Sequence, residues 1–319
     1  MKKILFALCA MATLASCSNE EIVNFDKEAI AFDGAFVDNG TRAADDFTIE
    51  TNELFDFKVW ATTKRPSSTE IVPIMQEVIV CRPDLVSDWV YPTANTQYWI
   101  PGNTYQFVAA KNYKGVTLTN GVPSKFTYDA ADQKDLLYAA HTREGLEAGH
   151  NTAVAFTFDH LLSKAYFTVD TNAMSGDNDN YTYRVSDLRI TNAVKEATYT
   201  VDGATWAGTA YYTAQDPLTF DHVNARGKLA ADQTYTSDLA RLLVPATYTD
   251  SNKLNITCTI ETLYGDSVID VQKYDKSIVQ TFEKGCVYNF VLALKDPGEP
   301  IEFTVTRVNE WVSAGTPAL

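Results

Sequence analysis

The stretches AVAFTF at residues 153–158 and AYFTV at residues 165–169 decide the fold class. In both, apolar residues recur at period two, which is typical of half-buried β-strands. Helical periodicity is nearly absent from the chain. Further stretches of the same kind are separated by clusters of Gly, Pro, Asn and Asp, the clearest at residues 55–60, 105–109 and 254–260. The sequence therefore predicts an all-β protein built from sandwiches.

A partial internal repeat predicts that there are two related sandwiches. The sequence GNTYQFVAA at residues 102–110 matches GCVYNFVLA at residues 285–293 at five of nine positions. Each copy has the form of a turn glycine followed by a strand. We place the boundary after the loop at 145–149, which gives an N-terminal sandwich over residues 43–150 and a C-terminal sandwich over residues 151–319.

The N-terminus carries a signal for export and lipidation. Two lysines precede an apolar stretch that ends in Leu14-Ala15-Ser16-Cys17, the residue order of a bacterial lipobox. The stretch is shorter than the roughly 20 residues that a membrane span needs. We expect a signal peptide over residues 1–16, a lipid on Cys17 and, from the acidic residues that follow, an outer-membrane lipoprotein at the cell surface. An ordinary secretory peptide with a chance cysteine is the alternative.

Charge and cysteine content narrow the possible partners and redox states. Acidic residues outnumber basic ones 41 to 26, a net charge of −15, which disfavours nucleic acid as a partner. Beyond the signal peptide and Cys17 the chain has only Cys81, Cys258 and Cys286. This odd number does not form a disulfide framework. Buried thiols are the favoured state of Cys258 and Cys286, and a disulfide between them is the alternative.

No motif in the sequence supports catalysis. The four histidines lack the spacing of a zinc hydrolase, and nucleophile-elbow, phosphate-loop and dinucleotide patterns are absent. Asp177 to Asn180 begins like a calcium loop, but Tyr181 and Arg184 interrupt the series of ligands. We therefore expect no enzymatic activity, no metal and no cofactor. A hydrolase without a recognisable motif is the least favoured alternative.

The segments FDHLLSKAYFTV at residues 158–169 and FEKGCVYNF at residues 282–290 resemble the fimbrillin family, the subunits of type V pili. The resemblance implies two tandem transthyretin-like β-sandwich domains and export as a lipoprotein. It also implies trimming by an arginine-specific protease and polymerisation with other fimbrial subunits by donor-strand exchange. The membrane would be a partner only through the lipid anchor.

Residues 17–42 would then form a lipidated N-terminal segment that holds a first strand. Period two places Ile30, Phe32, Gly34 and Phe36 on one face of that strand. Arg42 follows in a loop of small and polar residues, so that cleavage between Arg42 and Ala43 would release the strand and the lipid together. A plain linker with an incidental arginine is the alternative.

The last alternating stretch, within residues 301–311, is the candidate donor strand. Its apolar positions are Ile301, Phe303 and Val305, and two prolines separate it from the preceding strand. Alternatively, it closes the chain's own second sandwich. The second functional hypothesis is a surface lipoprotein that stays anchored and monomeric and binds glycans through aromatic residues close together in sequence, namely Trp89, Tyr91, Tyr98 and Trp99.

Overall fold

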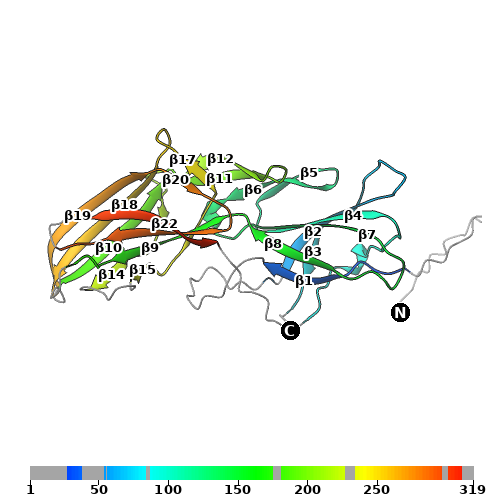
Figure 1. Cartoon of the computed structure of the whole chain (residues 1–319), viewed down its shortest axis with the longest axis horizontal. Coiled ribbons are helices and arrows are strands. Elements are labelled where there is room, and N and C mark those ends of the chain that lie inside the picture. Colours follow the sequence, from blue (N-terminus) through cyan, green and yellow to red (C-terminus); the bar gives the residue numbers. More distant parts are fainter. Residues whose placement is uncertain are drawn as a thin grey trace, which may run out of the picture.

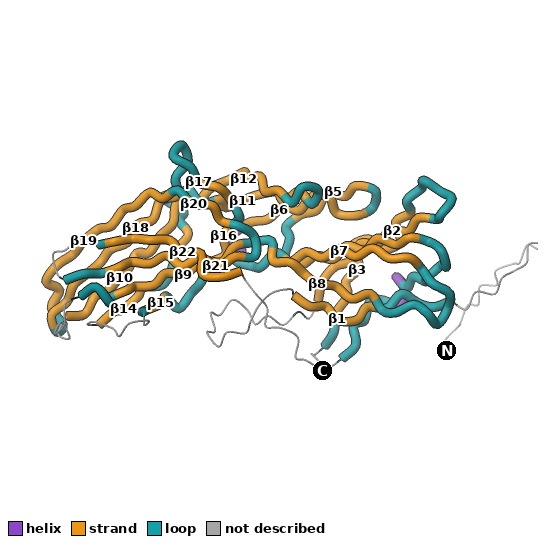
Figure 2. Tube along the Cα trace, viewed as in Figure 1, coloured by secondary structure: helices purple, strands orange, loops and turns teal. Residues whose placement is uncertain are grey.

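A computed structural model of the chain describes residues 27–37, 54, 56–83, 87–174, 181–226, 234–296 and 301–310. Cys17, Arg42 and Ala43 lie outside these ranges. The described residues are mostly in strands (Figure 2), and the helical elements among them are two short 3-10 helices, Thr93–Asn95 and Ala130–Asp132. This confirms the all-β prediction. Within the same ranges, no helix is both long and apolar enough to cross a membrane.

The first sheet has six strands in the order β1-β8-β7-β4-β2-β3. Neighbouring strands are antiparallel except β1 and β8, which are parallel. Among the described residues, the edge strand β1 pairs with one strand, β8. The bounds are β1 Phe32–Val37, β2 Asp56–Lys64, β3 Val72–Cys81, β4 Thr104–Lys111, β7 Leu137–Glu144 and β8 Val154–His160.

A four-stranded sheet joins the two halves of the sequence. Its order is β12-β11-β6-β5, so the hairpin of β5 and β6 pairs with β11 and β12 from beyond residue 150. The bounds are β5 Gly115–Thr119, β6 Val122–Asp129, β11 Val194–Thr200 and β12 Thr205–Tyr211. Figure 1 shows this bridging sheet above the middle of an elongated molecule.

The C-terminal half consists mainly of two further sheets. In one, β10 lies between β18 and the short strands β13 and β14, and β19 forms the edge; in the other, β9 and β21 are parallel and β22 forms the edge. A small sheet pairs β17 with β20. The bounds are β9 Ser163–Asp170, β10 Tyr181–Thr191, β13 Leu218–Thr219, β14 Val223–Arg226, β15 Tyr235–Thr236, β16 Arg241–Leu243, β17 Ala246–Tyr248, β18 Leu254–Tyr264, β19 Ser267–Ile278, β20 Gln280–Phe282, β21 Cys286–Ala293 and β22 Glu302–Glu310.

The buried residues form two clusters, the larger of which also takes in Phe126 and Tyr199 of the bridging sheet. One lies on the first sheet and includes Phe57, Phe107 and Phe156; the other includes Phe167 and Phe290 of the C-terminal half. Strand β8, at residues 154–160, pairs with β1 and β7 of the first sheet. The expected boundary between residues 150 and 151 therefore does not coincide with the end of this sheet, because hydrogen bonding continues to His160.

The internal repeat corresponds to two equivalent turns and strands. Gly102 and Gly285 have φ angles of 77° and 65°, a region that favours glycine, and they precede β4 and β21. The hydroxyl of Tyr105 accepts a hydrogen bond of 2.7 Å from the backbone N–H of Ile100. The hydroxyl of Tyr288 accepts one of 2.8 Å from the N–H of Glu283, again five residues earlier. The turn-and-strand interpretation of the repeat is thus confirmed.

The cysteines of the C-terminal half are buried thiols. Burial raises the pKa of the Cys258 thiol to about 12. The Cys286 thiol donates a hydrogen bond to the carbonyl oxygen of Lys284. Cys258 and Cys286 are not joined by a disulfide. Cys81 is also a free thiol, but it is exposed. This confirms the state that the sequence favours.

Candidate functional site

The candidate site is the position occupied by residues 28–32 and the start of β1. We call it the slot: β8 bounds it on one side, and the backbone of residues 97–99 bounds it on the other. On the first side the N–H of Val154 donates to the carbonyl of Ala31 over 2.8 Å. On the second, Ile30 donates to Gln97 over 2.8 Å, and Trp99 donates to Glu28 over 2.9 Å. The first strand is therefore held by backbone hydrogen bonds from two sides.

Two side chains anchor the segment in the core. Ile30 is 1% and Phe32 5% exposed, whereas Ala31 and Asp33 between and after them are exposed. The ring of Phe32 lies in an aromatic cage, with centroid distances of 5.5 Å to Tyr91, 6.3 Å to Phe107 and 5.9 Å to Phe156. Burying two such side chains contributes about 3–6 kcal/mol before the cost of ordering the segment.

The backbone register changes after Phe32. Phe32 is opposite Val154, but Ala35 is opposite Phe156, so that three residues of β1 span two of β8. Phe36 is consequently opposite Thr157, not opposite a residue in the same phase as Val154. Such an irregularity shifts the alternation by one residue. Ile30 and Phe32 face the core as expected, whereas the side chains of Gly34 and Phe36 lie outside those that the structure describes, so the continuous face stays a prediction beyond Phe32.

Polar contacts hold the start of the segment. The carboxylate of Glu28 accepts hydrogen bonds of 2.7 Å from the side-chain amide of Asn151 and 3.1 Å from the N–H of Gly149. The Asn151 hydrogen bond, with smaller contributions from backbone groups, lowers the pKa of Glu28. The hydroxyl of Tyr91 donates to the carbonyl of Ile30 over 2.6 Å. The sequence did not predict these contacts, because Asn151 and Tyr91 lie far from Glu28 along the chain, and Tyr91 was assigned to glycan stacking instead.

Strand β22 is held at an edge of the second half. It pairs with β21 on one side, and Ile301, Phe303 and Val305 are only half-buried. The Phe303 ring has its own aromatic cage, with centroid distances of 6.1 Å to both Tyr274 and Phe290 and 6.5 Å to Phe167. In this structure the strand closes its own sheet, which is the alternative arrangement that the sequence allowed.

Of the four residues proposed for glycan stacking, the two tryptophans are buried, Tyr91 is half-buried and Tyr98 is 42% exposed. Trp89 is 7% and Trp99 is 6% exposed. Trp89 packs against Phe57 at 4.9 Å between ring centroids, and the guanidinium of Arg82 lies 4.6 Å from the Trp89 ring centroid. Arg143 lies in the same way 4.7 Å from the Trp99 ring centroid. Neither indole therefore offers an open face to a sugar, and Tyr98 is the exposed ring of the four.

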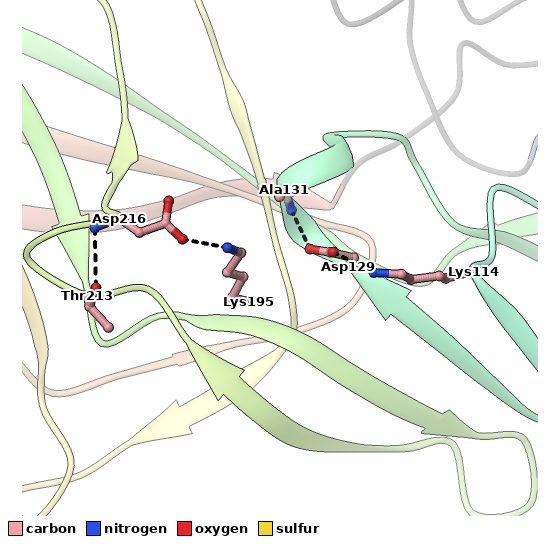
Figure 3. A network of polar contacts seen from close by, with 6 residues as sticks. All are labelled: Lys114, Asp129, Ala131, Lys195, Thr213 and Asp216. Atoms are coloured by element: carbon pink, nitrogen blue, oxygen red, sulfur yellow. Dashed lines mark hydrogen bonds and ion pairs between the residues drawn. The ribbon is translucent and has the colours of Figure 1, made fainter.

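Charged side chains elsewhere fit structural roles. Asp129 and Glu196 are opposite each other where β6 pairs with β11, an arrangement that is repulsive by itself. Lys114 binds Asp129 over 2.8 Å, and Lys195 binds Asp216 nearby (Figure 3).

His160 is buried with its Nδ1 against the Asp135 carboxylate. Among the described residues, no group of three or more His, Cys, Asp or Glu is placed to hold a metal; Asp177 to Asn180 lie outside them.

A family model described as fimbrillin-like matches residues 41–311, which is most of the chain. The chain belongs to the fimbrillin-like family. This confirms the resemblance carried by residues 158–169 and 282–290. The matched range ends just past β22 and begins just before Arg42, so that the slot residues 28–32 precede it.

Two solved structures are similar to this fimbrillin-like chain. A fimbrial protein from Bacteroides vulgatus is 17% identical with a TM-score of 0.58, covering 90% of this chain and 100% of its own. A proposed cell adhesion protein from Bacteroides ovatus is 15% identical with a TM-score of 0.51, covering 91% and 99%. At such identities the likeness concerns the fold. No curated protein sequence matches significantly.

Proposed function

We propose that this chain is a structural, non-enzymatic subunit of a cell-surface fimbria that contributes to adhesion. The observation that carries the proposal is the slot: a segment lying between Cys17 and Arg42 in the sequence has Ile30 and Phe32 buried in the first core. Membership of the fimbrillin-like family supports association with other fimbrial subunits.

In this proposal the chain is an outer-membrane lipoprotein anchored through Cys17, with two tandem transthyretin-like sandwiches outside the cell. An arginine-specific protease cleaves between Arg42 and Ala43. Cleavage cuts the covalent link between the slot residues and the rest of the subunit, so that a strand from a neighbouring subunit can replace them. An unfilled slot would expose backbone groups along both of its sides, which makes it a template for another strand.

The donated strand in this proposal is β22, with Ile301, Phe303 and Val305 as its anchors. Its outer edge has no strand neighbour among the described residues, and its anchors are only half-buried at home. Donation requires breaking the ladder between β21 and β22. The free energy gained by burying the anchors in the slot must therefore exceed the free energy lost when this ladder breaks.

The experiment is limited cleavage of the purified full chain with an arginine-specific protease. We expect a new N-terminus at Ala43 and then a ladder of polymers that resists SDS without heating. Deleting residues 301–319 should abolish the ladder, whereas deleting only residues 311–319, which follow β22, should preserve it. Absence of cleavage in this region, or a ladder that persists without residues 301–319, would contradict the proposal.

A further inference from the structure

The slot residues and the start of the candidate donor strand share a sequence pattern. Residues 28–32 are Glu-Ala-Ile-Ala-Phe, and residues 299–303 are Glu-Pro-Ile-Glu-Phe, so that Glu-x-Ile-x-Phe occurs in both. In each segment the Ile and Phe are two residues apart and point to one side of an extended chain. Glu299 is outside the described residues and enters only as part of this pattern.

The two phenylalanines also have matching surroundings. Phe32 contacts one tyrosine and two phenylalanines, Tyr91, Phe107 and Phe156. Phe303 likewise contacts one tyrosine and two phenylalanines, Tyr274, Phe167 and Phe290. Phe107 and Phe290 occupy the same position of the internal repeat. Phe303 therefore already lies in a site of the same kind as the one that Phe32 occupies.

Apart from the hydrogen bonds that the Glu28 carboxylate accepts from Asn151 and Gly149, the remaining polar contacts of the slot do not depend on side-chain identity. The bonds from Val154, Trp99 and Tyr91 go to backbone carbonyls of residues 28–31, and Gln97 accepts from a backbone N–H. The outward positions Ala31 and Asp33 are exposed, as are Glu302 and Thr304. A strand with the Ile-x-Phe spacing can thus take over the backbone bonds while its polar residues stay in solvent.

From these observations we propose the register of strand exchange between copies of this chain. Ile301 of one copy takes the site of Ile30 in the next copy, and Phe303 takes the site of Phe32, with the incoming strand parallel to β8. This inference rests on the proposed function and adds to it the pairing of residues. The gain is in burial, because Ile30 and Phe32 are 1% and 5% exposed whereas Ile301 and Phe303 are half-buried at home.

The register can be tested by disulfide trapping in cleaved, polymerised full chain that carries Cys81→Ser. In the proposed register Glu302 takes the place of Ala31, one residue before Phe32, and so lies opposite Ala153, one residue before Val154. Residues directly opposite each other on neighbouring strands are close enough for their cysteine variants to form a disulfide. The variant Glu302→Cys with Ala153→Cys should give covalent dimers after oxidation. The matched pair Glu302→Cys with Ala155→Cys, shifted by two residues, should not.

The outcomes distinguish a failure of the proposed register from a failure of the proposed function. A ladder with crosslinks through position 153 alone supports the register. A ladder with crosslinks through position 155, or through neither position, overturns it while leaving strand exchange intact. If no ladder forms with either pair, the proposed function fails and the register falls with it.

A side-chain exchange gives a second readout that needs no new cysteines. Ile301→Phe with Phe303→Ile keeps the composition but overfills one site and underfills the other, so we expect ladder yield to fall about tenfold. The control exchanges the outward residues, Glu302→Thr with Thr304→Glu, and should leave the yield unchanged. Circular dichroism of each uncleaved variant shows whether it folds. Equal loss in both folded variants would contradict the assignment.

Discussion

Phe32 and Phe303 occupy similar aromatic cages but differ in burial, and this difference predicts different costs of truncation. Phe32 is 5% exposed, so that Phe32→Ala should destabilise the uncleaved chain by about 3–5 kcal/mol. Phe303 is half-buried in an edge strand, and Phe303→Ala should cost less. Urea denaturation of the two variants measures the order. Asp33→Ala, at an exposed neighbour of Phe32, is the control and should change stability by less than about 0.5 kcal/mol.

The carboxyl group of Glu28 should make the stability of the folded chain depend on pH. Its pKa is lowered in the folded chain, chiefly by the hydrogen bond from Asn151. A carboxyl group with a lowered folded pKa stabilises the fold above its unfolded pKa of about 4.3, and that contribution is lost as pH falls through the folded pKa. The difference in urea midpoint between the natural chain and Glu28→Gln should therefore be constant near neutral pH and should shrink below about pH 4. The control is Glu70→Gln, which removes a carboxylate at an exposed position between β2 and β3, outside the slot.

At the scale of elements, β22 and β21 should differ in hydrogen exchange although they share one ladder. Strand β21 lies between β9 and β22, whereas β22 has a strand on one side only. In the described part of the chain, amides on the outer edge of β22 have no ladder partner, and the side chains of residues 302–307 are half-buried or exposed. Hydrogen exchange of the uncleaved chain should show residues 302–310 exchanging well before residues 286–293. Equal protection of the two strands would indicate that β22 does not detach from β21 more easily than β21 detaches from β9.

Some of the strands could be predicted from the sequence, whereas the loop and the register around the slot could not. Alternation identified strands such as β8, β9 and β18, because each buries one face and the period-two pattern is local. The rim formed by residues 97–99 was missed, because loop backbone that accepts and donates hydrogen bonds has no side-chain pattern. The aromatic residues near it were instead interpreted as a glycan platform. The irregularity after Phe32 was also missed, since register is decided by the partner strand β8 and not by β1 itself.

For the whole molecule, the repeat predicted two related halves but not the sheet that joins them. Pairing of β6 with β11 links residues 125–129 to residues 196–200, and nothing in either segment identifies its distant partner. Both strands contribute buried side chains to the larger core, including Phe126, Tyr128 and Tyr199. The bridging sheet therefore couples the halves through hydrogen bonds and through side-chain packing, which has a consequence for unfolding.

We expect the uncleaved chain to unfold in one transition, with tryptophan fluorescence and far-ultraviolet circular dichroism giving the same midpoint. Tyr199→Pro should separate this into two transitions. Tyr199 is opposite Phe126 in the centre of the bridging sheet, and proline there removes a ladder donor and a buried ring. The control is Glu196→Gln in the same strand, which relieves repulsion with Asp129 and should keep a single transition. If Tyr199→Pro lowers the midpoint but both probes still coincide, then contacts other than the bridging sheet join the two cores.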